Sequence, residues 1–118
     1  MAPEERDAAL LFDLTTAAKE IGAFVSDIDF ERFQSEKLVR YAVERQLIVI
    51  SEAARHLSES IRLLTPEVPW KAIVGLRNIL AHEYGEILAE RVWLVATRDI
   101  PALIGALEPH LPEGFRSP

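Results

Sequence analysis

The stretch SEKLVRYAVERQLIVISEAARHLSESIRLL, residues 35–64, decides the fold of this chain. Its apolar side chains recur at three- and four-residue intervals, as they do on the buried face of an amphipathic helix. They are Val39, Ala42, Val43, Leu47, Val49, Ile50, Ala53, Ala54, Leu57 and Ile61. We therefore expect one helix over residues 35–64, which at about 1.5 Å per residue would span roughly 45 Å and be the longest element.

The segments on either side show the same helical periodicity. We expect further helices over residues 3–26, 69–81 and 86–97, and a last one that Asp99 caps and that ends before Pro109. A connector over residues 27–34, with a short turn capped by Asp29, and the proline-containing TPEVP segment, residues 65–69, separate these helices. No stretch alternates strictly between polar and apolar residues. The sequence thus predicts an all-α protein, an antiparallel bundle of four to five helices, with a frayed tail over residues 108–118.

Composition narrows the class of protein. The 118 residues are 49% hydrophobic and 27% charged, which is typical of one compact domain over residues 1–118. The absence of cysteine excludes disulfides, zinc–thiolate sites and cysteine nucleophiles. The acidic N-terminus does not resemble a targeting peptide, and no apolar run approaches the roughly 20 residues of a membrane span. We expect a cytoplasmic protein without a membrane partner.

The net charge of −6 opposes non-specific attraction to nucleic acid. We expect no DNA partner, and an RNA partner would have to meet a local basic patch. On the helix predicted over residues 35–64, Lys37, Arg40 and Arg45 are candidates for an RNA path, although a solvated helix face is the default explanation.

Tyr41 and Ile48 fall on the charged face of that helix at about 100° per residue. Isolated apolar residues are normal on a protein surface. Alternatively, the two side chains contact a second subunit, and the protein is a homodimer.

A second stretch, GLRNILAHEYGEI over residues 75–87, concentrates polar groups within a helical pattern. If the helix continued through Tyr84 and Arg77 were set at 0°, Asn78 would lie near 100°, His82 near 140° and Tyr84 near −20°, at about 100° per residue. All four would share one half of the helix. The apolar residues of the opposite half would pack on the preceding helix, and they are Ile73, Leu76, Ile79 and Leu80.

This set of side chains suits phosphoryl transfer at RNA without a metal ion or a cofactor. His82 can take a proton from the ribose 2′-hydroxyl or give one to the leaving 5′-oxygen, and Arg77 can stabilise charge on the phosphorane. Asn78, four residues before His82, can fix the imidazole tautomer. Because one imidazole cannot easily do both proton transfers, a two-fold dimer would bring two histidines and two arginines to one cleft.

A purely structural explanation stays open for the same residues. Arg77 would pair with an acidic neighbour, His82 would lie at a helix C-terminus where an imidazolium is favourable, and Tyr84 would pack.

The pattern Arg77-x4-His82-x-Tyr84, with Asn78 after the arginine, resembles the signature of the HEPN superfamily and specifically of the HepT-like ribonuclease toxins. The resemblance extends over most of the chain, through residues 43–60, 68–87 and 92–107. The family pattern usually has glycine where this chain has Ser51, a departure that we expect to affect helix packing alone.

The resemblance implies a dimeric helical bundle that acts as a metal-independent RNA endonuclease, the toxin of a toxin–antitoxin pair. It also implies a cognate antitoxin, a minimal nucleotidyltransferase that can transfer AMP to the motif tyrosine, which Tyr84 matches. The alternative, from a different functional class, is a non-catalytic helical module that binds a nucleotidyltransferase partner or a nucleotide.

For the remaining candidate side chains, the sequence favours a structural role over a catalytic or metal-binding one. Glu44 and Glu52 lie within about 80° on one helix and could form a carboxylate pair, but interleaved arginines favour salt bridges instead. His56 has no acidic cluster at ligand spacing around it, and His110 lies in the proline-rich tail, so we expect surface residues and no metal site. Trp70 and Trp93 are expected in the core or at an interface.

Overall fold

The computed structural model describes residues 3–112 and 114, and over these residues the secondary structure is helical without a strand. The all-α prediction is therefore confirmed. The helices are α1 (Pro3–Val25), α2 (Phe30–Ser35), α3 (Lys37–His56), α4 (Glu59–Leu64), α5 (Trp70–His82), α6 (Gly85–Leu94) and α7 (Ile100–Leu107), with a π-helical segment η1 (Val95–Asp99) and a 3₁₀ segment η2 (Glu108–His110).

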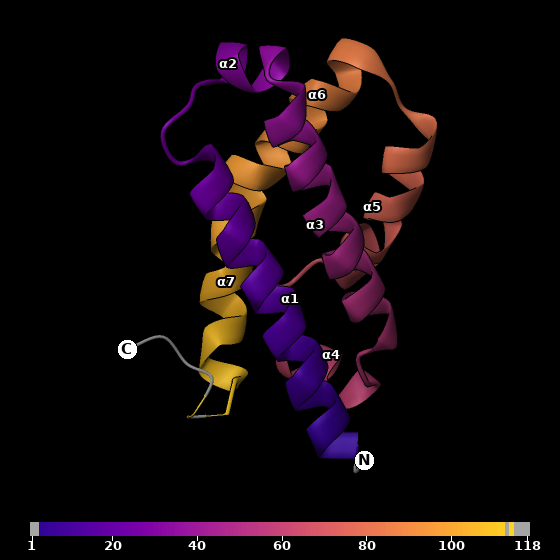
Figure 1. Cartoon of the computed structure of the whole chain (residues 1–118). Coiled ribbons are helices and arrows are strands. Elements are labelled where there is room, and N and C mark those ends of the chain that lie inside the picture. Colours follow the sequence, from indigo (N-terminus) through magenta and orange to yellow (C-terminus); the bar gives the residue numbers. More distant parts are fainter. Residues whose placement is uncertain (1–2, 113, 115–118) are drawn as a thin grey trace.

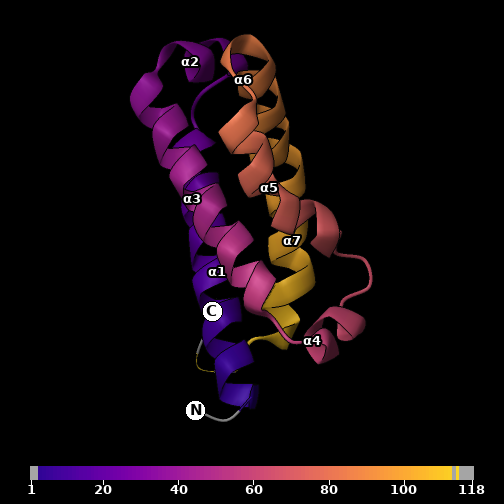
Figure 2. The ribbon, with the colours of Figure 1, turned by 90° about the vertical axis from the view of Figure 1, so that its right-hand side faces the viewer.

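Four long helical segments run up and down the molecule. α1 and α5 run in one direction, and α3 and the α6–η1–α7 segment run in the other (Figure 1). The short helices α2 and α4 lie at opposite ends, where they connect α1 to α3 and α3 to α5 (Figure 2). α1 packs against both α3 and α7, and α5 packs against α3. The largest fully buried apolar side chains come from α1, α2, α3, α7 and the residue after η2, and are Leu11, Leu14, Ile21, Phe33, Val43, Leu47, Ile50, Leu107 and Leu111.

The first helix and the connector after it follow the sequence prediction. α1 covers residues 3–25, close to the expected 3–26. The Asp29 carboxylate accepts a hydrogen bond from the Arg32 backbone N–H at 2.9 Å and so caps α2. Trp93 packs against Phe33, with 5.2 Å between ring centroids, and thereby holds α2 against α6.

The single helix predicted over residues 35–64 is wrong, because the structure divides it into α3 and α4. Leu57 leaves the helical region at φ −65° and ψ 144°, and the Ser58 side chain caps α4 by accepting from the Ile61 backbone N–H. The Asp7 carboxylate of α1 accepts from the Ser58 backbone N–H (3.0 Å) and from the Ser58 hydroxyl (2.6 Å). Because this tertiary contact satisfies the groups that the break exposes, the local helical periodicity is overridden. α1, with 23 residues, is longer than α3, with 20.

The break predicted at residues 65–69 is present, and a buried hydrogen bond supports it. The Trp70 Nε1–H donates to the Thr65 hydroxyl oxygen at 3.0 Å, and that hydroxyl donates to the Ile61 carbonyl at 2.8 Å. Thr65 is fully buried and Trp70 nearly so. The segment between α4 and α5 is therefore tied to the core at both ends, and the prediction of a structural role for Trp70 is confirmed.

The separate fourth and fifth helices predicted from the sequence are also wrong. α6, η1 and α7 follow one another without a break, and Asp99 keeps helical angles (φ −81°, ψ −35°) without a side-chain cap. The Ile100 N–H donates to the Val95 carbonyl, five residues earlier, which is the bond of a π turn. Such a turn accommodates Pro101, which has no N–H to donate, within a continuous helical path.

The start of the predicted frayed tail is ordered, which corrects that part of the prediction. Residues 108–110 form η2, and Leu111 is buried. Lys19 of α1 pairs with Glu108 at 3.2 Å. The rest of the predicted tail, residue 113 and residues 115–118, lies outside the described residues. Among those that are described, no helix combines the length and apolar character that a membrane crossing requires.

Replacing Asp7 by alanine should destabilise the protein, because the change leaves two Ser58 donors without their acceptor. We expect a loss of roughly 1–3 kcal/mol in the free energy of unfolding, measured by urea denaturation. Asp13→Ala, at an exposed position of the same helix, is the matched control. Equal stability of the two variants would show that the Asp7 contact does not stabilise the α3–α4 break.

Candidate functional site

The polar residues of the GLRNILAHEYGEI stretch lie on the outer surface of α5. Arg77, Asn78 and His82 are all exposed, and 66% of the Arg77 side chain is open to solvent. The apolar residues of α5 point the other way, toward the core, with Ile73 buried and Leu76 partly buried. The helical spacing thus predicts the two faces of α5 correctly.

Tyr84 does not continue this face, which corrects the prediction of a regular helix through that residue. α5 ends at His82, and Glu83 and Tyr84 are extended, with Tyr84 at φ −136° and ψ 164°. Gly85 then adopts φ +63°, a left-handed conformation that glycine tolerates best, and starts α6. Tyr84 is 81% exposed, so its hydroxyl lies on an open linker two residues after His82.

His82 is the last residue of α5 and lies at the C-terminal end of that helix. No hydrogen bond joins it to Asn78 among the side chains that the structure describes. The pairing expected from their four-residue spacing is thus not formed in this arrangement.

Arg77 contacts a cluster of charged residues on α3. Its Nη1 donates to Glu52 Oε2 at 3.3 Å. The other carboxylate oxygen, Oε1, accepts from Arg55 Nη2 at 2.9 Å and lies 3.1 Å from His56 Nε2. We call Glu52, Arg55, His56 and Arg77 the Glu52 cluster. Hydrogen bonds lower the pKa of the Glu52 carboxyl, and the bond from Arg55 has a larger effect than the bond from His56. The carboxyl group is therefore ionised at neutral pH.

The residue next to Glu52 holds the two helices together. Ser51 is buried, and its hydroxyl donates to the Val74 carbonyl of α5 at 2.8 Å. The serine at the position where the related pattern has glycine therefore adds a hydrogen bond between α3 and α5. Because Val74 lies three residues before Arg77 on α5, this contact also fixes the position of Arg77 along α3, next to Glu52.

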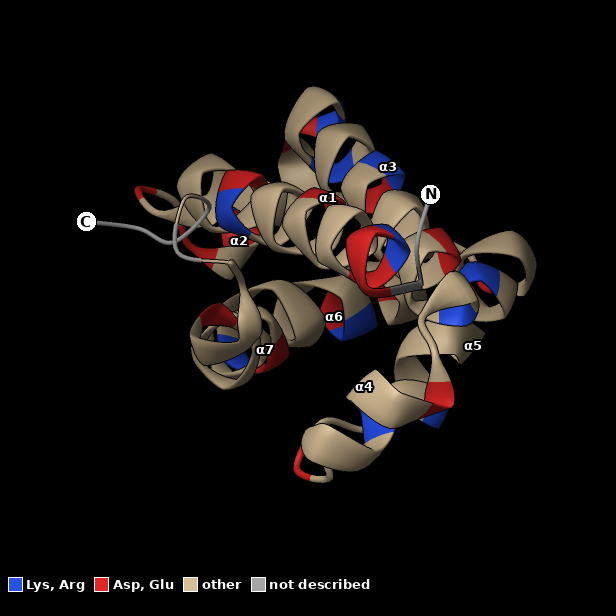
Figure 3. Ribbon diagram, turned by 90° about the horizontal axis from the view of Figure 1, so that it is seen from below, with Lys and Arg blue, Asp and Glu red and all other residues tan. Residues whose placement is uncertain are grey.

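The residues predicted to form an RNA path do not lie on a single line. At about 100° per residue, Arg45 lies about 20° from Glu52 around α3, whereas Arg40 lies about 120° away. Lys37 and Arg45 are exposed, and the Arg40 guanidinium carbon lies 5.8 Å from the centre of the Tyr41 ring. Basic and acidic residues are interspersed along α3 (Figure 3). The structure brings Arg77 to Glu52, Arg55 and His56, but not to Arg40.

The possible carboxylate pair is not formed. Glu44 and Glu52 are separated by about 12 Å along the α3 axis, since each residue rises about 1.5 Å. Burial raises the pKa of the Glu44 carboxyl, an effect that the nearby Arg40 opposes. Within residues 3–112 and 114, no group of three or more acidic or histidine side chains is arranged to hold a metal ion. His56 lies at the surface as predicted, and His110 is half-buried in η2.

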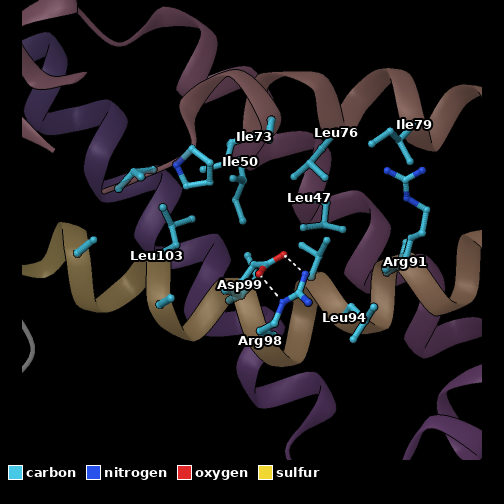
Figure 4. A pocket seen from close by; sticks show the side chains of 18 of the residues that line it. Leu47, Ile50, Ile73, Leu76, Ile79, Arg91, Leu94, Arg98, Asp99 and Leu103 are labelled. Carbon is cyan, nitrogen blue, oxygen red and sulfur yellow. Dashed lines mark hydrogen bonds and ion pairs between the residues drawn. The ribbon is translucent and has the colours of Figure 1, made fainter. Parts of the chain in front are cut away.

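An apolar groove is lined on one side by α5 residues that include Leu76 and Ile79. It has a volume of about 470 Å³ and separates α5 from α6–η1–α7. Figure 4 shows Leu76 and Ile79 on one wall, Leu94 and Leu103 on the other, and Leu47 of α3 between them. Arg91 and Arg98 lie along one wall, and Arg98 is paired with Asp99. The groove is therefore distinct from the polar surface that carries Arg77 and His82.

The pairing of Arg77 with an acidic neighbour, left open as a structural alternative, is present, but the sequence did not identify Glu52 as that neighbour. The spacing of Glu52, Arg55 and His56 on one helix was a signal for local pairing. No sequence spacing, however, relates Glu52 to Arg77, which lies 25 residues away. The contact depends on how α5 packs on α3.

The chain is similar in sequence to known proteins over most of its length. The model of the family described as "Ribonuclease HepT-like" matches residues 14–109. A Methanocaldococcus jannaschii protein named "Putative RNase MJ1380" is 41% identical over 95 residues, which are 80% of this chain and 87% of that protein. A Thermococcus cleftensis protein named "Probable ribonuclease HepT" is 34% identical over 98 residues, 83% of this chain and 89% of that protein.

No solved structure matches the chain at a significant level. The family match nevertheless spans all of α3 and α5 and about half of α1, so it includes every residue of the surface described above. The chain belongs to the HepT-like ribonuclease family.

Proposed function

We propose that this protein is a metal-independent RNA endonuclease and the toxin component of a cytoplasmic toxin–antitoxin pair. The observation that carries the proposal is the joint exposure of Arg77 and His82 on the outer face of α5, in a chain that belongs to a ribonuclease family. A catalytic arginine and histidine must be open to a polymeric substrate, and both are.

Each residue has a role in a transesterification at phosphorus. The ribose 2′-oxygen attacks the adjacent phosphorus, and the bond from phosphorus to the 5′-oxygen breaks. His82 takes the proton of the 2′-hydroxyl or supplies the proton that the 5′-oxygen needs. Arg77 binds the phosphate and stabilises the charge that builds on its oxygens. Asn78 is the residue that orients the His82 ring when RNA is bound.

We propose that the active form is a homodimer of one helical domain per chain. One His82 cannot easily perform both proton transfers, and a two-fold partner would supply a second. Exposed apolar side chains support contact with a second subunit. At the N-terminal end of α3, Leu38 is 86% exposed and Tyr41 is 56% exposed, and Ile87 in the first turn of α6 is 66% exposed. Ile48, which we expected beside Tyr41, is half-buried.

The proposed antitoxin is a minimal nucleotidyltransferase that modifies Tyr84. The phenolic oxygen would attack the α-phosphorus of ATP, pyrophosphate would leave, and a tyrosyl-AMP ester would form. The extended, exposed linker gives the Tyr84 hydroxyl the access that such a transfer needs. A nucleotide at this position would add negative charge and bulk close to His82, where the RNA phosphate must bind.

The apolar groove favours a second candidate function. A volume of about 470 Å³ between α5 and α6–η1–α7 suits a non-catalytic helical module that binds a nucleotidyltransferase partner or a nucleotide. Such a module would bind its partner stably and would not affect growth when produced alone, whereas a ribonuclease toxin would arrest growth.

Replacing His82 by alanine should abolish RNA cleavage while the fold is kept, because the side chain is exposed at a helix end. We expect a loss of about 100-fold or more in the rate of cleavage of a purified RNA pool in the presence of chelator. His110→Ala is the control for loss of an imidazole elsewhere. Wild-type rates in the His82→Ala variant would rule out the proposed role of His82.

Replacing Tyr84 by phenylalanine should prevent modification and leave cleavage intact. We expect intact-protein mass spectrometry, after incubation with the neighbouring nucleotidyltransferase and ATP, to show added AMP on the wild type and none on the variant. Tyr41→Phe, which removes the other tyrosine hydroxyl of the chain, is the matched control and should still gain AMP. AMP on Tyr84→Phe would place the acceptor at another residue.

A further inference from the structure

We infer that Glu52 is a positioning residue of the ribonuclease site, which holds the Arg77 guanidinium by one nitrogen and leaves its opposite edge open for the RNA phosphate. The inference rests on the function proposed above and adds a residue of α3 to a site that otherwise lies on α5 and the linker after it.

The contact between the two residues uses only part of the guanidinium. Nη1 of Arg77 donates to Glu52 Oε2 at 3.3 Å. Nε and Nη2, which lie together on the other edge of the planar group, have no partner among the described residues. That edge is the one that binds two phosphate oxygens side by side. Since 66% of the Arg77 side chain is exposed, the open edge is accessible to a polymeric substrate.

The Glu52 carboxylate is itself held in place. Arg55 and His56, three and four residues further along α3, both contact Oε1, which leaves Oε2 for Arg77. The adjacent Ser51 fixes the backbone of α3 to the Val74 carbonyl of α5. The Glu52 and Arg77 side chains therefore extend from two helices whose relative position is fixed by the Ser51–Val74 hydrogen bond.

Holding an arginine in advance of binding favours catalysis. A free arginine side chain has many rotamers, and ordering it on the phosphate costs conformational entropy. A contact that selects one rotamer in the unbound protein reduces that cost and places the guanidinium where charge develops. The negative charge of Glu52 opposes RNA, but Arg55 and Arg77 together outweigh it, so the cluster keeps one net positive charge when His56 is neutral.

The contact contributes little to folding stability. Glu52 is half-exposed and Arg77 mostly exposed, and ion pairs in such surroundings are largely screened by solvent. A loss of activity on replacing Glu52 would therefore reflect the position of Arg77 and not unfolding. The alternative effect, in which Glu52 withholds Arg77 from RNA, predicts the opposite change in activity.

The test uses the full-length protein, a short single-stranded RNA and chelator. Glu52→Ala should lower kcat by about 10- to 100-fold, as expected when a catalytic group is displaced by about 1 Å. Affinity for the same RNA with 2′-deoxy sugars, which cannot be cleaved, should change by less than about threefold, because Arg77 keeps its charge. Glu52→Gln should restore part of kcat, since its amide oxygen still accepts a hydrogen bond from Arg77. The melting temperature of both variants should match that of the wild type.

Two controls make each outcome decisive. Glu90→Gln, at an exposed position on α6, should leave kcat unchanged. In an Arg77→Ala background, adding Glu52→Ala should lower kcat no further, because the residue to be positioned is gone. A wild-type protein that does not cleave RNA would overturn the proposed function and this inference together. A wild type that cleaves, beside a Glu52→Ala variant that is equally fast or faster, would overturn the inference alone.

Discussion

α5 rests on α3 through apolar side chains on its inner face and through the hydrogen bond from the buried Ser51 hydroxyl to the Val74 carbonyl. This packing turns Arg77 outward and places it within reach of Glu52. It also leaves a groove between α5 and α6–η1–α7, because α6–η1–α7 is held mainly by α1 and α2. The positions of the polar surface and of the groove thus follow from one helix-to-helix contact.

The positions at which α5 begins and ends also determine where the candidate site residues lie. At the start, the Trp70 indole donates to the buried Thr65 hydroxyl and fixes where the helix begins. At its C-terminus, the helix ends at His82, and the extended linker that follows exposes the Tyr84 hydroxyl. The imidazole therefore lies at a helix C-terminus, and the tyrosine lies where an enzyme can reach it. Because α5 ends at His82, the two residues have different backbone conformations although they are close in sequence: His82 is helical and Tyr84 is extended.

An acidic protein can present cations to RNA only locally. The formal net charge is −6, yet the surface beside Arg77 also carries Arg55 and His56, and Glu52 contacts all three. The Glu52 carboxylate has two opposite effects in this arrangement. It weakens the positive potential that attracts RNA, but it restricts the rotamers of Arg77. The family match covers the whole of this surface, which supports the proposal that the surface cleaves RNA.

Periodicity in the sequence determined the helical class, the two faces of α5 and the residues of the candidate motif, because these depend on spacing along one chain segment. Tertiary structure alone decided the break at Ser58, the continuous path through η1, the partners of Glu52 and the groove. The break needs the Asp7 carboxylate, 51 residues earlier, to bind the Ser58 N–H and hydroxyl. Glu52 meets Arg77 only when α5 packs on α3. Contacts between residues so distant in sequence leave no local pattern, since they depend on where whole helices come to lie.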